Sequence, residues 1–188
     1  MANIWSGTRK VINVYKQGLI LVVTGNGKGK TTSSMGMAVR ALGHGIKVAV
    51  IQFMKGRPYY GEYKHLSQFG HDKILFKQVG RNEFVNMNNP EQVDRDLARQ
   101  GWELAQECLQ GDFGLVILDE INVALDYGLI EVDSVVAALR SKHPHVTVIL
   151  TGRGAPPAIR TLADTISVIA EEKHHYAAGI QAQAGIEF

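Results

Sequence analysis

Cysteine is nearly absent from this chain of 188 residues, whose only example is Cys108. One cysteine cannot form an internal disulfide. The N-terminus also lacks the charged and then apolar pattern of a secretory signal, together with the small-residue cleavage site that would follow it. The two absences predict a cytoplasmic protein.

Long apolar runs and blocks of one charge are missing as well. No run approaches the ~20 apolar residues that a membrane-spanning helix requires. The 20 Lys and Arg residues are set against 18 Asp and Glu residues, for a formal net charge of +2, and no block of like charges stands out along the chain. We therefore expect neither insertion into a membrane nor a general role in nucleic-acid binding.

Short apolar runs bounded by glycine alternate along the chain with segments of helical spacing. The runs cover residues 19–23, 48–53, 115–118 and 146–150, and they are typical of strands buried on both faces. Apolar residues at helical spacing in two intervening segments are Val93, Leu97, Gly101, Leu104 and Cys108, then Val132, Val135, Val136 and Leu139. Such alternation predicts an α/β fold with an open, mostly parallel sheet covered by helices on both faces, whose ligands gather beyond the carboxyl ends of the strands.

Residues 1–17 precede the first apolar run and mix Lys, Arg, Asn, Ser and Gly with scattered apolar residues. This composition predicts a flexible N-terminal arm. From residue 18 onward there is no internal repeat and no low-complexity linker, and the length is that of one globular domain. We therefore expect residues 18–188 to form a single domain.

Residues 24–32 read Thr-Gly-Asn-Gly-Lys-Gly-Lys-Thr-Thr, directly after the first apolar run and directly before a helical stretch at 33–42. Strand, loop and helix in this order are typical of the Walker A phosphate-binding loop. Its glycines let several backbone N–H groups point at one anion, and the following helix adds the positive end of its dipole. Lys30 supplies a mobile charge for the phosphates, and the Thr31 hydroxyl is placed to ligate Mg²⁺.

One position departs from the strict Walker A pattern, because Thr24 stands where the motif has its first glycine. Gly25 follows at once and the Gly-Lys-Thr end of the motif is intact, so the alternative of a glycine-rich turn that carries lysine by accident is disfavoured. The loop residues that we predict to bind ATP are Gly25, Asn26, Gly27, Lys28, Gly29, Lys30, Thr31 and Thr32.

A second half of the same site stands at residues 114–120, which read Gly-Leu-Val-Ile-Leu-Asp-Glu. An apolar strand that ends in carboxylates is the Walker B arrangement of P-loop proteins. Parallel strands bring their carboxyl ends to one edge, so Asp119 and Glu120 are predicted beside Thr31 as ligands of Mg²⁺ or of its waters. Alternation puts the two carboxylates on different sides of the strand, which leaves open which of them touches the metal. An ordinary acidic strand end or a helix cap is the alternative.

The loop and several further segments, taken in order, resemble the P-loop class of ATP:corrinoid adenosyltransferases over residues 18–188. The segments after the loop are Arg40-Ala-Leu-Gly-His-Gly, Gln52-Phe-Met-Lys-Gly, Gly61-Glu62, Leu118-Asp-Glu, Thr151-Gly-Arg-Gly, Lys173-His174 and the C-terminal run 178–188. Each segment is weak alone, but the ordered set is specific. The resemblance implies a P-loop NTPase-like, RecA-like fold.

The chemistry that the resemblance implies is transfer of the 5′-deoxyadenosyl group of ATP to the Co(I) centre of a reduced corrinoid, cobalamin or a precursor, with triphosphate as leaving group. Co(I) is itself a strong nucleophile, so the protein has only to hold C5′ near cobalt and to neutralise the departing triphosphate. The implied catalytic residues are Lys30, Thr31 and Glu120, with Mg²⁺ or Mn²⁺ at Thr31, Asp119 and Glu120. The family further implies a homodimer and a flavodoxin-like reductase that supplies Co(I).

Four residues outside the loop and the carboxylate pair are candidates through their matching segments. Arg40 and Arg153 are predicted to contact the nucleotide, with a helix-end arginine and a turn residue between two glycines as the respective alternatives. Glu62 and Phe84 are predicted to contact the corrinoid. Phe84 is the only aromatic at 80–89, where some relatives carry aromatic residues that displace the lower axial ligand of cobalt, and a buried core position is the alternative.

Two other functions stay open at the level of sequence. A P-loop kinase or ATPase would use the same loop in the usual direction and would produce ADP and phosphate. A thymidine-kinase-like version is disfavoured, because its structural zinc needs several cysteines. A nucleotide-dependent binding module would take up ATP and corrinoid without releasing triphosphate.

Overall fold

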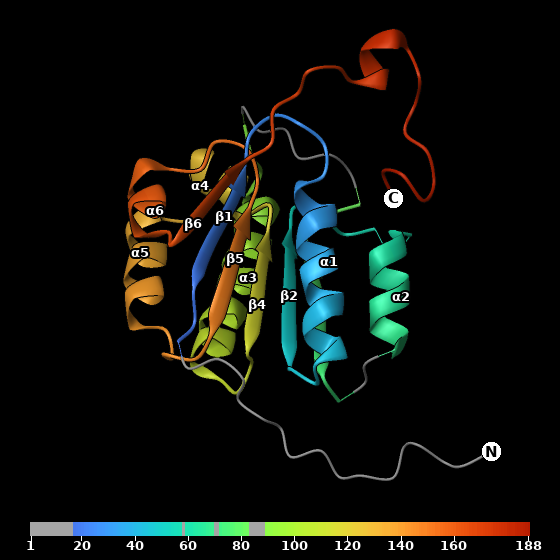
Figure 1. The fold of residues 1–188 in the computed structure, drawn as a ribbon. Coiled ribbons are helices and arrows are strands. Elements are labelled where there is room, and N and C mark those ends of the chain that lie inside the picture. Colours follow the sequence, from blue (N-terminus) through green and yellow to red (C-terminus); the bar gives the residue numbers. More distant parts are fainter. Residues whose placement is uncertain (1–16, 58, 70–71, 83–88) are drawn as a thin grey trace, which may run out of the picture.

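The computed structural model describes residues 17–57, 59–69, 72–82 and 89–188, which contain one six-stranded sheet (Figure 1). The strands are β1 (Ile20–Thr24), β2 (Val48–Phe53), β3 (Ile74–Val79), β4 (Leu115–Asp119), β5 (Thr147–Thr151) and β6 (Thr165–Val168). Their order across the sheet is β3-β2-β4-β5-β1-β6. All pairings between neighbours are parallel. The predicted open parallel sheet is thereby confirmed.

Helices cover both faces of this sheet, as the alternation predicted (Figure 1). They are α1 (Lys30–Gly43), α2 (Gly61–Phe69), α3 (Gln92–Gln110), α4 (Ile121–Asp126), α5 (Val132–Ser141) and α6 (Pro157–Leu162), with a short 3₁₀ helix η1 (His175–Ala178) near the C-terminus. Side chains of α1 and α2 pack with Val48 and Val50, whereas those of α3 to α6 pack with Ala49 and Ile51. Successive residues of β2 thus face opposite layers, which explains why the central runs are apolar throughout.

The prediction that Val93 belongs to the buried face of α3 is wrong. Val93 is 42% exposed, and the inward position there belongs to Asp94, which is 5% exposed. The Asp94 carboxylate accepts hydrogen bonds from the Glu91 backbone N–H (2.9 Å) and from Arg81 (2.8 Å), so a capped helix start and an ion pair occupy the inward side. The buried side then continues through Ala98, Gly101, Trp102, Ala105, Cys108 and Leu109. The predicted burial of Gly101 and Cys108 is confirmed.

The carboxyl ends of all six strands share one edge of the sheet, because the strands run in one direction. The glycine-rich loop follows β1 at this edge, Asp119 ends β4 there, and Thr151 ends β5. Residues that lie far apart in the sequence therefore meet beyond the strand ends, where ligands of such sheets bind.

Two further expectations concern membranes and the N-terminus. None of the helices in the described part of the chain is both long enough and apolar enough to cross a membrane. The predicted arm at residues 1–17 lies outside the described residues, apart from Gln17.

Candidate active site

The loop between β1 and α1 has the shape of a phosphate-binding loop. Gly25 (φ 99°) and Gly29 (φ 112°) adopt the left-handed backbone region that favours glycine. α1 begins at Lys30, three residues before the predicted start, so the loop runs directly into the helix N-terminus. Gly27 donates its N–H to the Ile169 carbonyl (2.8 Å) in the chain that follows β6. The backbone after β6 thus supports the loop at Gly27. Residues 28–32 line a hollow of about 450 Å³.

Gly25→Ala is expected to distort this loop and to lower both the melting temperature and the affinity for ATP. A Cβ on Gly25 would lie 2.4 Å from the Ile169 carbonyl oxygen, at a φ that other residues rarely adopt. Gly36→Ala in α1 is the matched control, because a Cβ there meets nothing within 4 Å and alanine favours the helix by about 1 kcal/mol. Thermal unfolding and ATP titration check both variants. A Gly25→Ala protein as stable as the wild type would contradict the close approach.

Lys30 lies in the first turn of α1 and is 8% exposed. Its ammonium donates a hydrogen bond to the Gly27 carbonyl (2.7 Å), so the side chain curls over the loop. Burial lowers the pKa of Lys30, against the attraction of Glu120, which raises it. A phosphate bound at the loop would add a further negative charge beside this buried ammonium and would favour its charged form.

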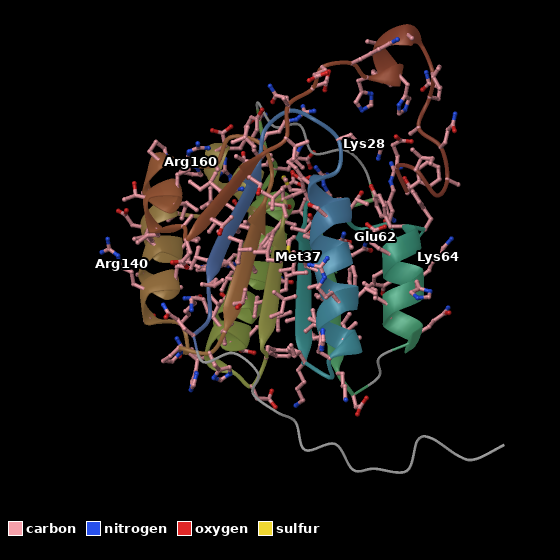
Figure 2. All side chains as sticks on the ribbon, in the orientation of Figure 1. Lys28, Met37, Glu62, Lys64, Arg140 and Arg160 are labelled. Atoms are coloured by element: carbon pink, nitrogen blue, oxygen red, sulfur yellow. The ribbon has the colours of Figure 1, made fainter. Side chains whose placement is uncertain are left out.

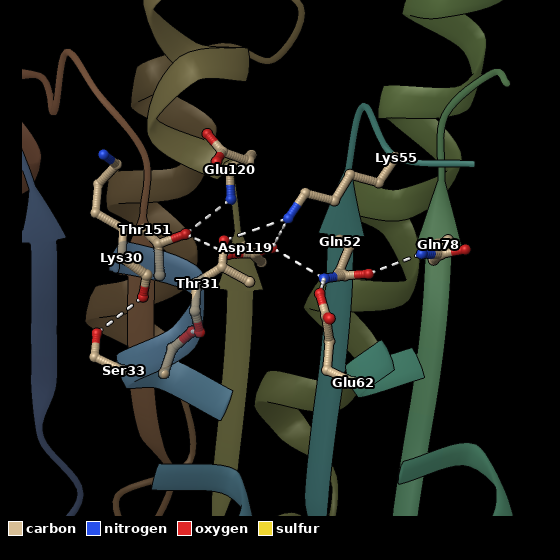
Figure 3. A network of polar contacts seen from close by, with 11 residues as sticks. Lys30, Thr31, Ser33, Gln52, Lys55, Glu62, Gln78, Asp119, Glu120 and Thr151 are labelled. Carbon is tan, nitrogen blue, oxygen red and sulfur yellow. Dashed lines mark hydrogen bonds and ion pairs between the residues drawn. The ribbon is translucent and has the colours of Figure 1, made fainter. Parts of the chain in front are cut away.

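Asp119 is the centre of the polar network shown in Figure 3 and is 0% exposed. Its Oδ1 accepts hydrogen bonds from the hydroxyls of Thr31 (2.9 Å) and Thr151 (2.7 Å). Its Oδ2 accepts hydrogen bonds from Gln52 (3.1 Å) and Lys55 (2.8 Å). The structure thus brings Thr31 and Asp119 together at one edge, as the parallel sheet predicted, and it fills every acceptor position of the carboxylate with a protein donor.

Glu120 is arranged differently from its neighbour Asp119. Its backbone is left-handed (φ 64°), a conformation that only Met54 shares among the described residues other than glycine, and such strain gathers at functional sites. No described residue donates a hydrogen bond to the Glu120 carboxylate, which lines the hollow. Burial, and then the charge of Asp119, raises the pKa of Glu120. Asp119 is therefore held by the protein, whereas Glu120 is open to a ligand.

Lys55 is the charged residue of this network that was not predicted from the sequence. Its ammonium lies 2.8 Å from Asp119 Oδ2 and 3.3 Å from Thr31 Oγ1. Burial disfavours its charge, but the charge and hydrogen bond of Asp119 outweigh burial and raise the pKa of Lys55. Two signals were available for it: Lys55 belongs to the Gln52-Phe-Met-Lys-Gly segment, and it lies just beyond the end of an apolar strand.

Glu62, in the first turn of α2, lines the hollow beside the phosphate-binding loop. It accepts a hydrogen bond from Gln52 (3.3 Å), whose own side-chain oxygen accepts one from Gln78 (2.9 Å). It lines the same hollow as Lys28, and Figure 2 shows both residues on the side of the molecule where the C-terminal segment folds back. Contact between Glu62 and a corrinoid stays a prediction. For such contact the corrinoid would have to reach the hollow that the loop residues also line.

The C-terminal segment forms one wall of the same hollow. Lys28 of the loop makes an ion pair with Glu187 (3.6 Å). The Phe188 ring packs edge-on against Tyr59, with 5.1 Å between ring centroids. Residues 185–188 thus line the hollow together with the loop.

The two predicted arginines are placed very differently. Arg153, after β5, donates a hydrogen bond to the Asn26 carbonyl of the loop (3.2 Å), so it is brought to the site. Arg40 lies in the last turn of α1, about 15 Å along the helix axis from Lys30. It lines a separate hollow at the amino ends of β4 and β5. The helix carries Arg40 away from the loop, so the structure does not bring it to the nucleotide site. Phe84 lies outside the described residues.

Oxygen donors suited to a divalent ion converge on this edge. Thr31 and Glu120 line the hollow. Asp119 does not line it but accepts a hydrogen bond from the Thr31 hydroxyl. A few hard oxygen donors fit Mg²⁺ or Mn²⁺, which keep waters and take further ligands from phosphates. Within the described ranges no group of three or more His, Cys, Asp or Glu side chains could hold a metal by itself. An ion here would therefore take its remaining ligands from water or from the phosphates of the nucleotide.

The parallel sheet, the phosphate loop and the carboxylates at the end of β4 together define a P-loop nucleotide-binding protein. A solved structure with a similar fold is the flagellar accessory protein FlaH of Methanocaldococcus jannaschii. It superposes with a TM-score of 0.52 at 14% identity, over 81% of this chain and 71% of that chain. This likeness concerns the fold alone, and the predicted P-loop NTPase-like, RecA-like architecture is confirmed.

Sequence comparison gives the particular family. Residues 16–188 match the family described as ATP:corrinoid adenosyltransferase BtuR/CobO/CobP. The corrinoid adenosyltransferases of Pseudomonas aeruginosa and Escherichia coli K12 are 41% and 40% identical to this chain, each over 92% of it and over 85% and 87% of the relative. The chain belongs to this family, and the resemblance that the ordered motifs indicated is confirmed.

Proposed function

We propose that this chain transfers the 5′-deoxyadenosyl group of ATP to the Co(I) centre of a reduced corrinoid and releases triphosphate. The observation that carries the proposal is a hollow built for a triphosphate and not for an attacking side chain. Lys28, Lys30 and Lys55 line it, and no Ser, Cys or His does so among the described residues. The other polar side chains in its lining are those of Thr31, Thr32, Glu62, Glu120 and Glu187. Membership of the adenosyltransferase family supports the same reaction.

Because cobalt supplies the nucleophile, the protein has only to hold the substrates in place and to neutralise the leaving triphosphate. The electron pair of Co(I) forms the bond to C5′ while the C5′–O bond breaks, and the pair of that bond leaves with the triphosphate. Cobalt ends as Co(III) bound to carbon. No proton moves at the reacting atoms, so the site needs no general base. The chain has to orient C5′ and to stabilise the charge that gathers on the triphosphate.

Each part of the site has a role in holding the leaving group. The N-terminus of α1 and the loop N–H groups other than that of Gly27, which is bonded to Ile169, would bind the phosphates, and Lys30 adds a positive charge. Arg153, already at the loop, offers a planar pair of donors to a phosphate. Thr31, Asp119 and Glu120 would hold Mg²⁺ or Mn²⁺, which supplies further positive charge at the phosphates.

For the corrinoid side we propose Glu62 and Phe84 as contacts, with cobalamin or an incomplete precursor as the substrate. Glu62 supports this by its place in the hollow, and Phe84 by its place in the matching segment. The family resemblance also supports a homodimer and a flavodoxin-like reductase that reduces Co(II) to Co(I).

Product analysis separates this reaction from phosphoryl transfer. With MgATP and chemically reduced cobalamin we expect triphosphate and a light-sensitive Co–C product in equal amounts, measured by phosphorus NMR and the visible spectrum. ADP with orthophosphate, and no organocobalt product, would indicate a P-loop kinase or ATPase. Binding of both substrates without release of triphosphate would indicate a non-catalytic module. The same mixture without protein controls for direct alkylation of the reduced cobalt.

A further inference from the structure

The Lys55 ammonium contacts Asp119 and Thr31, the two side chains where a divalent ion is also expected. We propose that Lys55 holds Asp119 and Thr31 while no nucleotide is bound, and that it moves onto the triphosphate when a divalent ion takes its place. The inference deepens the proposed function and rests on one part of it, the binding of a metal triphosphate at the loop. It gives Lys55, one of the three lysines that line the hollow, a role that changes when the nucleotide binds.

Lys55 and a divalent ion compete for the same oxygens. The Lys55 ammonium lies 2.8 Å from Asp119 Oδ2 and 3.3 Å from Thr31 Oγ1, and these two side chains are predicted to hold the metal. The ammonium contacts both side chains, which also hydrogen bond directly to each other (2.9 Å). Because Mg²⁺ takes its ligands at about 2.0–2.1 Å, an ion bound to Asp119 Oδ2 and Thr31 Oγ1 would have to occupy the position of the ammonium. Two positive charges this close also repel each other strongly. Entry of the ion therefore requires Lys55 to leave.

The ammonium that leaves Asp119 stays within the hollow. The backbone at Lys55 is fixed, because Met54 next to it donates its N–H to the Val79 carbonyl (2.9 Å). The four-carbon stem is flexible, so the charge can move while the backbone stays in place. The side chain is 16% exposed, and it lines the same hollow as Lys30, with Tyr60 behind it at 5.4 Å from the ammonium to the ring centroid. A triphosphate at the loop is the anion within its reach.

The exchange also keeps Asp119 paired in both states. Asp119 is 0% exposed, and a buried carboxylate without a cation beside it is strongly destabilising. Lys55 supplies that cation in the absence of nucleotide, and the divalent ion supplies it afterwards. The lysine then becomes free for the triphosphate at the moment when the triphosphate is present.

Two titrations of Lys55→Met test the exchange, with Lys47→Met as the matched control. Lys47 forms a surface ion pair with Asp112, just before β2 starts at the opposite edge of the sheet. We expect Lys55→Met to bind Mn²⁺ without nucleotide at least about tenfold more tightly, measured by electron paramagnetic resonance, because a competing charge is gone. At saturating Mn²⁺ we expect it to bind inorganic triphosphate at least about tenfold more weakly, measured by calorimetry, because a charged donor is lost. Lys47→Met should change neither affinity.

Opposite shifts in the two affinities are what a merely structural lysine would not give. A lysine that only supports the fold would weaken both affinities or change neither, and any result other than opposite shifts overturns the proposal. If Lys55→Met does not fold, Lys55→Arg decides, since a bidentate pair with Asp119 should weaken Mn²⁺ binding and an unchanged affinity overturns the proposal. Neither titration contains a corrinoid, so failure of adenosyl transfer in the wild type would leave this result standing.

Discussion

Lys30→Ala is expected to reduce kcat/KM for adenosyl transfer by at least about 100-fold, the scale on which loss of one preorganised charge-stabilising donor acts. Lys30 is 8% exposed and curled over the loop, with its ammonium 2.7 Å from the Gly27 carbonyl. The charge that it stabilises is complete only as the C5′–O bond breaks. The loss should therefore fall on kcat as well as on KM. Steady-state rates with reduced cobalamin and MgATP measure both.

Cys108→Ala is the control for this variant. Cys108 lies on the buried side of α3 and is 2% exposed, and burial raises its pKa to about 11. It is a small core residue and not a reactive thiol, so we expect wild-type rates and a small loss of stability. Near-normal turnover in Lys30→Ala, together with impaired turnover in Cys108→Ala, would reverse the assignment of the loop.

The central strands could be predicted from the sequence because both of their faces are buried. The four apolar runs at 19–23, 48–53, 115–118 and 146–150 match β1, β2, β4 and β5 within one residue at each end. β3 and β6 are the edge strands. Every residue of β6 is exposed, and β3 has one buried residue, so neither shows an uninterrupted apolar run. The two outer strands are thus the part of the fold that apolar patterning alone does not reveal.

The predictable part of the site is the part that follows from local order along the chain. The loop lies between a strand and a helix, and Asp119 and Glu120 end an apolar strand, so one edge collects them whatever the strand order. Lys55 depends on contacts that are not local, because β2 has to lie beside β4 before Lys55 can reach Asp119. The position of Arg40 depends on local geometry instead, since the rise of α1 alone places it far from the loop.

Asp119→Asn is expected to destabilise the protein by about 3 kcal/mol, the scale on which breaking a buried ion pair acts. The carboxylate accepts four hydrogen bonds at 0% exposure. An asparagine would turn its NH₂ group towards two donors, either the two threonine hydroxyls or Gln52 and Lys55. It would also leave Lys55 without its partner. Activity should fall together with the melting temperature.

Glu120→Gln should separate the two effects, because the Glu120 carboxylate accepts no hydrogen bond from the described residues. Burial raises the pKa of Glu120, and a carboxyl group whose pKa rises on folding lowers stability above its ordinary range, since the unfolded state solvates the charge better. Glutamine removes that charge, so the melting temperature should equal or exceed that of the wild type. The Mg²⁺ concentration for half-maximal rate should still rise at least about tenfold, because a partner of the metal is lost. Thermal unfolding and Mg²⁺ titration of the rate distinguish the carboxylates, and equal destabilisation by Asp119→Asn and Glu120→Gln would contradict this division of roles.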